Sequence, residues 1–342
     1  MRAVRIHAHG GPEVLALEDV PRPSPGPGEV LARTVAVSLN HLDVWVRRGM
    51  PGVEIPLPHV PGCDGTGVVE AVGDGVDASL VGRAVVLEPG FTHSDGPEVE
   101  AGLDHLAPDY GIRGEHAPGF CAEYVALPAR YVTALPDGVD PVAAAAVPLV
   151  FLTAWGMLHT RAEIATGETV LVLGAASGVG SAGIQIAKAA GCTVIATAGS
   201  EAKRALGTEL GADHVVDHRA DGWPKRVKEL TAGRGADVVF EHVGPATWAG
   251  SMRCLARRGR LVTCGGTTGP KVDVTLPHLF MKNQSVLGST MGPRAALPAI
   301  FDSVARGGFR PVVDRVLPIE RIADAHRMLE AREVLGKLVL TF

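Results

Sequence analysis

The chain has 342 residues, a formal net charge of −5 and 46% hydrophobic residues. At roughly 100–200 residues per domain, this length predicts two domains, each large enough to bury a core. The acidic balance, together with the lack of any run of five basic residues, excludes a general nucleic-acid-binding protein, so we expect no nucleic-acid partner.

The sequence predicts no membrane span and no secretion signal. No apolar run reaches the roughly 18 residues that a membrane helix needs, and the longest candidate, residues 141–158, contains two prolines and is expected to be a buried interdomain helix. The N-terminal "MRAVRIHAHG" is typical of a strand rather than a signal peptide. We therefore expect no membrane partner. Cysteine spacing without a CxxC pair favours a reducing, cytoplasmic setting; the cysteines are Cys63, Cys121, Cys192, Cys254 and Cys264.

The first part of the chain, to about residue 135, is rich in predicted strands and turns. Short runs such as "EVLARTVAVS", "GTGVVEAVG" and "GRAVVLEPG" are separated by glycine and proline clusters. Residues 88–118 are polar without clear periodicity, which predicts a long loop or lobe. We expect a β-rich domain over residues 1–145.

From Thr169 onward, predicted strands and helices alternate. Apolar runs of four to six residues followed by helical segments are typical of parallel βαβ units, and hence of a doubly wound α/β domain, expected over residues 146–292. In this pattern residues 246–259 are predicted as a helix, and Arg257–Arg260 as the end of that helix and the turn into the next strand. The tail, residues 319–342, predicts a helix and then a strand, and residues 293–342 are expected to complete the first domain.

The strongest chemical signal is the glycine-rich turn "GAASGVG", residues 174–180, which joins a predicted strand to a helix. Glycines allow a tight turn and a close approach of the backbone to a pyrophosphate, and a helix N-terminus supplies free N–H groups and a positive dipole. The turn therefore predicts a dinucleotide-binding site. Its candidate cofactor contacts are Ala175, Ser177, Gly178, Val179 and Gly180.

The end of the next strand indicates which dinucleotide binds. A carboxylate there would bind the ribose hydroxyl of NAD, but residues 198–200 are small and are followed by Lys203 and Arg204. Space and positive charge suit a 2′-phosphate, so we expect NADP(H) in preference to NAD(H), with Ser200 and Lys203 as contacts. Two alternatives remain. Lys203 and Arg204 are only solvated charges on the helix, or the cofactor is NAD(H), with Glu201 as the carboxylate.

Taken together, these features resemble the medium-chain dehydrogenase/reductase superfamily over essentially the whole chain. The matching segments are "GPEVLALEDVPRPSPGPGEVLARTVAVSLNHLDVWVRRG", "PHVPGCDGTGVVEAVGDGV", "PGFCAEYVALPA", "AAAAVPLVFLTAW" and "GETVLVLGAASGVGSAGIQIAKAAG". The subgroup that is most similar comprises zinc-type alcohol dehydrogenases close to the quinone oxidoreductases. The resemblance implies an α/β protein with a Rossmann domain, a GroES-like catalytic domain and a nicotinamide cofactor. It also implies that Thr153 lies near the nicotinamide and that Gly265 contacts the cofactor. For Thr153, the alternative is that its hydroxyl is hydrogen-bonded back to its own helix.

The zinc ligands of the superfamily are largely missing. By the resemblance, the catalytic ligand positions are Asn40, Cys63, Asp64 and Leu149, of which only Cys63 is a good zinc ligand. The structural zinc positions have lost every thiolate; they are His93, Gly96, Val99 and Ala107. We therefore expect no zinc, with a relict site as the alternative; its candidate ligands are His59, Cys63, His116 and Cys121.

Without a Lewis acid, reduction of a conjugated carbonyl is easier than oxidation of an alcohol. The candidate catalytic residues are Asn40, whose amide donates to substrate oxygen, Asp43, which orients the Asn40 loop, and Cys63. For Asp43 a purely structural role is the alternative, and for Cys63 that of a small buried filler. His41 is expected either to reach the cofactor phosphates or to be merely exposed.

The sequence thus predicts a zinc-free, NADP(H)-preferring reductase of quinones or α,β-unsaturated carbonyls. One alternative is an alcohol dehydrogenase, with or without zinc; another is a non-catalytic nucleotide-binding protein. The apolar segment "QSVLGSTMG", residues 284–292, is expected to be an edge strand that pairs with its own copy in a homodimer or homotetramer.

Overall fold

The computed structural model describes residues 1–50 and 52–342. The chain divides into two compact units, one of Met1–Leu149 with Pro293–Phe342 and one of Val150–Gly292. The division falls between Leu149 and Val150, a few residues after the boundary expected from the sequence.

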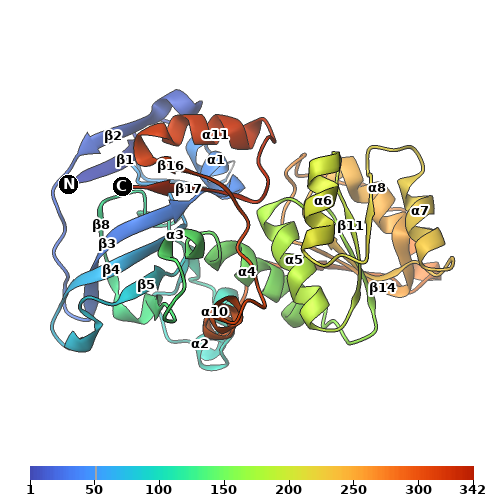
Figure 1. The fold of residues 1–342 in the computed structure, drawn as a ribbon, viewed down its shortest axis with the longest axis horizontal. Helices are drawn as coiled ribbons and strands as arrows, with labels where there is room; N and C mark the ends of the chain where they lie inside the picture. The colour runs from blue at the N-terminus through green and yellow to red at the C-terminus, as the bar shows by residue number, and fades with distance from the viewer. Residues whose placement is uncertain (51) are drawn as a thin grey trace. The chain divides into compact units, whose positions relative to one another are not determined.

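The first unit is built on a mixed β-sheet (Figure 1). Its strands, in spatial order, are β16 (Val313–Pro318), β17 (Lys337–Thr341), β3 (Glu29–Ser38), β4 (Asp64–Val72), β5 (Ala84–Leu87) and β9 (Val132–Ala134), with β8 (Tyr124–Pro128) also paired to β3. Two further antiparallel pairs accompany it: β1 (Arg2–Ile6) with β2 (Leu15–Asp19), and β6 (Gly90–Phe91) with β7 (Gly111–Ile112).

Five α-helices accompany this sheet among the described residues. They are α1 (His41–Arg48), α2 (Pro97–Glu100), α3 (Pro141–Ala144), α10 (Leu297–Ala305) and α11 (Ile322–Glu330). Short 3₁₀ helices are η1 (Pro12–Val14), η2 (Ala78–Leu80), η3 (Asp104–Leu106), η4 (Ala129–Tyr131), η6 (Arg294–Ala296) and η7 (Ile319–Arg321). The apolar face of α11 buries Ile322, Ala325 and Leu329 in the same core as strands β1, β3 and β17. The C-terminal segment is therefore part of the first unit's core, with the helix-then-strand order that the sequence predicts.

The second unit contains, within the described residues, a six-stranded parallel sheet. Its strands, in spatial order, are β12 (His214–Val216), β11 (Thr193–Thr197), β10 (Thr169–Val172), β13 (Ala236–Glu241), β14 (Leu255–Thr263) and β15 (Ser285–Gly288). Because every pairing is parallel, the carboxyl ends of all these strands lie at one edge. This is the Rossmann-type sheet expected from the alternating pattern.

The helices of the second unit connect these strands. They are α4 (Pro148–Trp155, which begins at the boundary), the π-helix η5 (Gly156–Arg161), α5 (Gly178–Ala189), α6 (Glu201–Glu209), α7 (Trp223–Leu230), α8 (Pro245–Cys254) and α9 (Leu276–Met281). No helix among the described residues is both long and apolar enough to cross a membrane.

One local prediction is wrong. The helix expected over residues 246–259 ends at Cys254, and the arginine-rich segment Arg257–Arg260 belongs to β14. The physical reason is pairing with β13: Leu255 lies opposite Ala236 and Arg260 opposite Val238, with an irregularity between them. Arg258 takes up that irregularity in the left-handed region, at φ 61°. Sheet hydrogen bonds thus replace the last helical turn.

Candidate active site

The register of the central sheet in the first unit creates a buried polar cluster. Strand β3 is paired on one side with β17, Ser38 opposite Val339, and on the other with β4, Ser38 opposite Asp64. The backbone N–H of Leu39 continues the first ladder by donating to the carbonyl of Leu338. Asn40, just beyond β3, is thereby brought beside the first residues of β4 and β17, which are Asp64 and Lys337.

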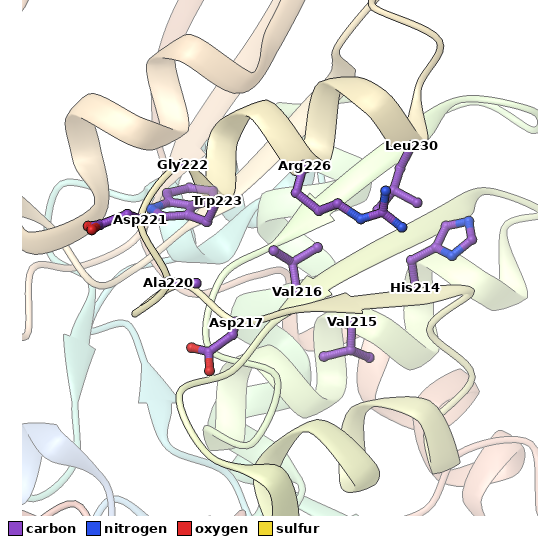
Figure 2. Close-up of a pocket in the computed structure, with 10 residues that line it drawn as sticks. All are labelled: His214, Val215, Val216, Asp217, Ala220, Asp221, Gly222, Trp223, Arg226 and Leu230. Carbon is purple, nitrogen blue, oxygen red and sulfur yellow. The ribbon is translucent and has the colours of Figure 1, made fainter.

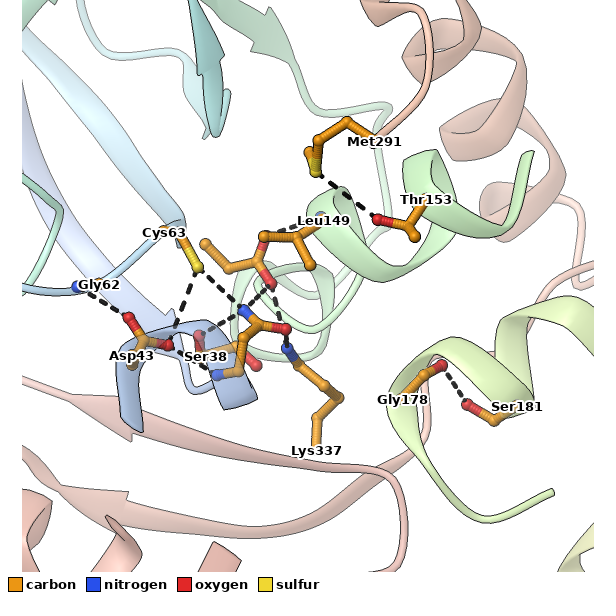
Figure 3. Close-up of polar contacts among 12 residues, drawn as sticks. Ser38, Asp43, Gly62, Cys63, Leu149, Thr153, Gly178, Ser181, Met291 and Lys337 are labelled. Carbon is orange, nitrogen blue, oxygen red and sulfur yellow. Dashed lines mark hydrogen bonds and ion pairs between the residues drawn. The ribbon is translucent and has the colours of Figure 1, made fainter. Parts of the chain in front are cut away.

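The amide of Asn40 lies at the centre of this cluster, and Figure 3 labels its partners Ser38, Cys63 and Lys337. Its Nδ2 lies 2.8 Å from Asp64 Oδ2, 3.3 Å from Cys63 Sγ and 3.4 Å from the carbonyl oxygen of Ser38. Its Oδ1 accepts a hydrogen bond from the ammonium of Lys337. Both ends of the amide therefore have partners within the first unit.

Asp64 and Lys337 form a buried ion pair. The ammonium of Lys337 lies 3.1 Å from Asp64 Oδ2. The side chain of Lys337 is 4% exposed and that of Asp64 is 0% exposed. The other carboxylate oxygen, Oδ1, accepts a hydrogen bond of 2.8 Å from the backbone N–H of Leu149. A buried charge is tolerated when it is paired and hydrogen-bonded, as Asp64 is here.

Asp43 fixes the loop that carries Asn40. Its Oδ2 accepts from the backbone N–H of Asn40 at 2.7 Å, and its Oδ1 accepts from the backbone N–H of Gly62 at 3.0 Å. These contacts fit both the orienting role predicted for Asp43 and its purely structural alternative. Burial raises the pKa of the Asp43 carboxyl from 3.8 to about 6, against the lowering effect of these hydrogen bonds and of Lys337.

Cys63 is a buried thiol at the edge of the cluster. Its Sγ lies 3.8 Å from Asp43 Oδ2. Burial, and then the charges of Asp43 and Asp64, raise the pKa of this thiol well above its ordinary value. The neutral thiol is thus the strongly favoured form, and a thiolate is disfavoured.

The glycine-rich turn in the second unit joins β10 to the N-terminus of α5. Gly174 has a positive φ of 67°, and the Oγ of Ser177 caps α5 by accepting from the N–H of Gly180 at 2.9 Å. A Cβ on Gly180 would lie 2.2 Å from the carbonyl oxygen of Gly174, so only glycine fits there. Ala175 is buried, whereas Ser177, Gly178 and Val179 are half-buried at the helix N-terminus.

The residues predicted to select NADP(H) over NAD(H) follow the end of β11. Ser200 is the N-cap of α6, as predicted, and accepts from the N–H of Lys203 at 3.4 Å. Arg204 is paired with Asp217 at 2.8 Å, so part of its charge is already balanced. Sequence reasoning missed Arg219: a Cβ built on Gly199 would meet Arg219 Nε at 2.5 Å. The only sequence signal was a basic residue shortly after the third strand.

His218 lies among charges of both signs at this end of the sheet. Burial lowers its pKa; the charges of Asp217 and Glu241 act against this, and the charges of Arg219 and Lys203 lower it further. Two cations therefore lie close enough to His218 to influence its titration.

The remaining predicted cofactor residues lie in the second unit. Thr153, on α4, is 5% exposed, and its Oγ1 lies 3.6 Å from Met291 Sδ rather than being bonded back to its own helix (Figure 3). Gly265 follows the carboxyl end of β14, and its carbonyl accepts from Thr263 Oγ1 at 3.2 Å. Gly265 thus belongs to the same sheet edge as the glycine-rich turn.

A second missed residue of this unit is His242, at the end of β13. It is 9% exposed, and its Nε2 lies 2.8 Å from the carbonyl oxygen of Leu173 and 3.2 Å from Ser177 Oγ. Burial lowers the pKa of His242, so the neutral imidazole is favoured beside the turn.

A catalytic zinc does not fit the cluster in the first unit. Of the four positions, Asn40 is engaged at both ends, Leu149 contributes only a backbone N–H, and Asp64 already binds an ammonium. Among the residues with described placement, no group of three His, Cys, Asp or Glu side chains is arranged to hold a metal. His59, a candidate for a relict site, is buried and bonded to the carbonyl of Gly114 at 3.0 Å.

Two surface cavities in the second unit lie away from the predicted turn. One, of about 290 Å³, lies between β12 and α7 and is lined by residues including Val215, Trp223 and Arg226 (Figure 2). The other, of about 820 Å³, is lined by residues including Arg219 and Lys228. None of the predicted cofactor contacts lines either cavity.

A parallel sheet with a glycine-rich turn at a helix N-terminus, in one chain with a β-rich unit that carries a buried polar cluster, defines the architecture of a nicotinamide-dependent dehydrogenase or reductase. Family models agree with this assignment. The alcohol dehydrogenase GroES-like domain matches residues 26–137, and the zinc-binding dehydrogenase domain matches residues 178–306.

Individual proteins match over almost the entire chain. A quinone oxidoreductase of Pseudomonas aeruginosa is 34% identical over 99% of both chains, and a 2-haloacrylate reductase of a Burkholderia species is 30% identical over 99% of this chain and 98% of the relative. A solved structure titled NAD-dependent alcohol dehydrogenase is 46% identical, with a TM-score of 0.97 and full coverage of both chains. The chain belongs to the medium-chain dehydrogenase/reductase superfamily of NAD(P)-dependent oxidoreductases.

Proposed function

We propose that this protein transfers hydride from NADPH to quinones or α,β-unsaturated carbonyl compounds without zinc. The proposal rests on the ammonium of Lys337, which donates hydrogen bonds to Oδ1 of Asn40 and Oδ2 of Asp64. Asn40 and Asp64 stand at positions where zinc-dependent relatives are expected to hold their metal. With a lysine there, the site has no Lewis acid to lower the pKa of an alcohol.

Reduction of a conjugated carbonyl needs less assistance. A bound nicotinamide would supply hydride to the β-carbon, the electron pair would move onto the carbonyl oxygen, and a proton from solvent would complete the reaction. Hydrogen-bond donors can stabilise the developing oxyanion. We assign this role to Nδ2 of Asn40. Its contact with Cys63 at 3.3 Å is the one a substrate oxygen can displace, because sulfur is a weak acceptor.

The preference for NADP(H) rests on Lys203 and Arg219. The Arg219 side chain packs on Gly199 at the end of β11, the position where NAD-binding proteins place a carboxylate. A guanidinium there suits a 2′-phosphate, which it can bind with two hydrogen bonds. We therefore retain NADP(H) as the expected cofactor and add Arg219 to its contacts.

The test is a substrate panel of quinones, enones, acrylates and primary and secondary alcohols. The panel is run with NADPH and NADH on metal-stripped protein, and again with added zinc. Turnover of quinones or enones by metal-stripped protein with NADPH supports the proposal. Activity that is confined to alcohols and appears only with zinc would contradict it.

The second candidate is an NAD-dependent alcohol dehydrogenase. It is favoured by the similarity to the solved NAD-dependent alcohol dehydrogenase, which is 46% identical over the full length. For this candidate, alcohol oxidation with NAD would exceed quinone or enone reduction in the same panel. The buried neutral thiol of Cys63 and the Asn40 amide, which is hydrogen-bonded at both ends, do not suit the binding of a catalytic zinc. This argues against an alcohol dehydrogenase that uses zinc.

We further propose that the protein is a homo-oligomer assembled through β15. This strand pairs only with β14 along the described sheet, and its Val286 is partly exposed. The neighbouring segment exposes Leu276, Phe280 and Met281. An apolar surface beside an open strand edge favours pairing with a second copy across a two-fold axis. A cytoplasmic location, in keeping with the unpaired cysteines of the described residues, also remains a proposal.

A further inference from the structure

The position of Lys337 is dictated by the sheet and not by a flexible loop. It is the first residue of β17, and the ladder between β17 and β3 brings it beside Asn40, 297 residues away in sequence. Its side chain is 4% exposed, in a strand whose next three residues, Leu338–Leu340, are all buried. A lysine is almost never buried to this extent unless it is paired.

The ammonium of Lys337 binds the atoms that would hold a metal ion. Its two hydrogen-bond acceptors are Asp64 Oδ2, at 3.1 Å, and Asn40 Oδ1. Carboxylate and amide oxygens are also ligands of divalent cations. A divalent ion bound to the same oxygens would lie beside the ammonium in a buried, weakly screened environment, where like charges repel strongly.

We propose that the ammonium of Lys337 takes the place of the catalytic metal in this chain and, by occupying the oxygens of Asn40 and Asp64, excludes a divalent cation. The ammonium balances the charge of Asp64 and holds the Asn40 amide with Nδ2 turned toward Cys63. This inference deepens the metal-free part of the proposed function and rests on that part alone. It predicts a latent metal site that opens when the lysine is shortened.

The test is a calorimetric titration of metal-stripped, full-length protein with cobalt chloride. Wild type is expected to give only the weak background of surface histidines, whereas Lys337→Ala is expected to bind one further Co²⁺ per chain. The matched control is Lys337→Ala combined with Asp64→Asn, which should return to the background. A single tight Co²⁺ site in wild type that Asp64→Asn abolishes would overturn the proposal. A folded Lys337→Ala that binds no more cobalt than wild type would also overturn it.

Folding is measured by circular dichroism, because Lys337→Ala leaves Asp64 buried without its cation. If this variant does not fold by itself, cobalt or propylammonium in the refolding buffer is expected to restore the folded signal, since a ligand of the native state stabilises it. Failure of both cations to restore folding would count against the proposal. These measurements need neither nicotinamide nor substrate, so an error in the proposed reaction would leave them unchanged.

Discussion

Arg47 and His326 are hydrogen-bonded in the interior of the first unit: Nη1 of the arginine lies 3.2 Å from Nδ1 of the histidine. Because a guanidinium can only donate, Nδ1 must be the acceptor, which leaves the proton of the neutral imidazole on Nε2. Arg47 also pairs with Glu330 and donates to the carbonyl of Gly10. The interaction joins α1 to α11 and holds His326 in its neutral form.

Protonation of His326 should therefore destabilise the fold. Burial, and then the charge of Arg47, lower the pKa of His326 from 6.5 to about 3. The unfolded chain takes up this proton below pH 6.5 and the folded chain does not, so stability is lost as the pH falls from 6.5 toward 3. Between pH 7.5 and 5, urea unfolding should show a loss from this residue of about 2 kcal/mol. The comparison variant is His326→Gln, whose amide oxygen can still accept from Arg47. If wild type and His326→Gln lost the same stability between pH 7.5 and 5, protonation of His326 would not be the cause of the loss.

Gly178→Val should weaken nucleotide binding without unfolding the protein. Gly178 is the first residue of α5 and is half-buried at the turn, where the backbone must approach the pyrophosphate. We expect NADPH affinity to fall at least tenfold, about 1.4 kcal/mol, in a fluorescence titration. Gly180→Ala is the contrasting variant: its Cβ would lie 2.2 Å from the carbonyl oxygen of Gly174, so the turn itself should be damaged. Normal NADPH binding by a folded Gly178→Val protein would refute the assignment of the turn.

Arg219→Ala should reduce the affinity for NADPH and leave that for NADH unchanged. The charge-assisted hydrogen bonds to a 2′-phosphate are worth roughly 1.5–3 kcal/mol, so the dissociation constant of NADPH should rise at least about tenfold. Lys203→Ala should act in the same direction. Lys225→Ala, an exposed lysine on α7, serves as the control for a general change in charge. Tighter binding of NADH than NADPH by wild type would show that the cofactor is assigned wrongly.

Phe280→Glu should dissociate the proposed oligomer. The side chain of Phe280 is 65% exposed on α9, beside the equally exposed Met281. A charge buried in an apolar interface without a partner is costly, so sedimentation should detect a smaller species than wild type. Val81→Glu changes another exposed apolar residue, in the first unit, and should leave the assembly intact. A wild-type protein that is monomeric at all concentrations would remove the basis of this prediction.

Local features of the sequence determined much of the second unit. The strand and helix periods, the glycine-rich turn and the N-cap at Ser200 depend on residues that are close in the chain, and the structure agrees with them. The arginine-rich segment Arg257–Arg260, which belongs to β14 and not to α8, could not be predicted in this way. There, pairing with β13 decided the backbone, and the partner strand lies in a different segment of the chain.

The sequence by itself identified the resemblance to the medium-chain dehydrogenase/reductase superfamily and to its reductases. It also revealed that the thiolate and histidine ligands expected for zinc are missing. It did not indicate what stands in their place. Lys337 lies in an ordinary strand segment, "GKLVLTF", and only the ladder between β17 and β3 brings its ammonium to Asn40 and Asp64. In the same way, only tertiary packing brings Arg219 against Gly199. Both contacts join residues on different elements that are separated in the sequence, so no local pattern predicts them and these two cations became visible only in the folded chain.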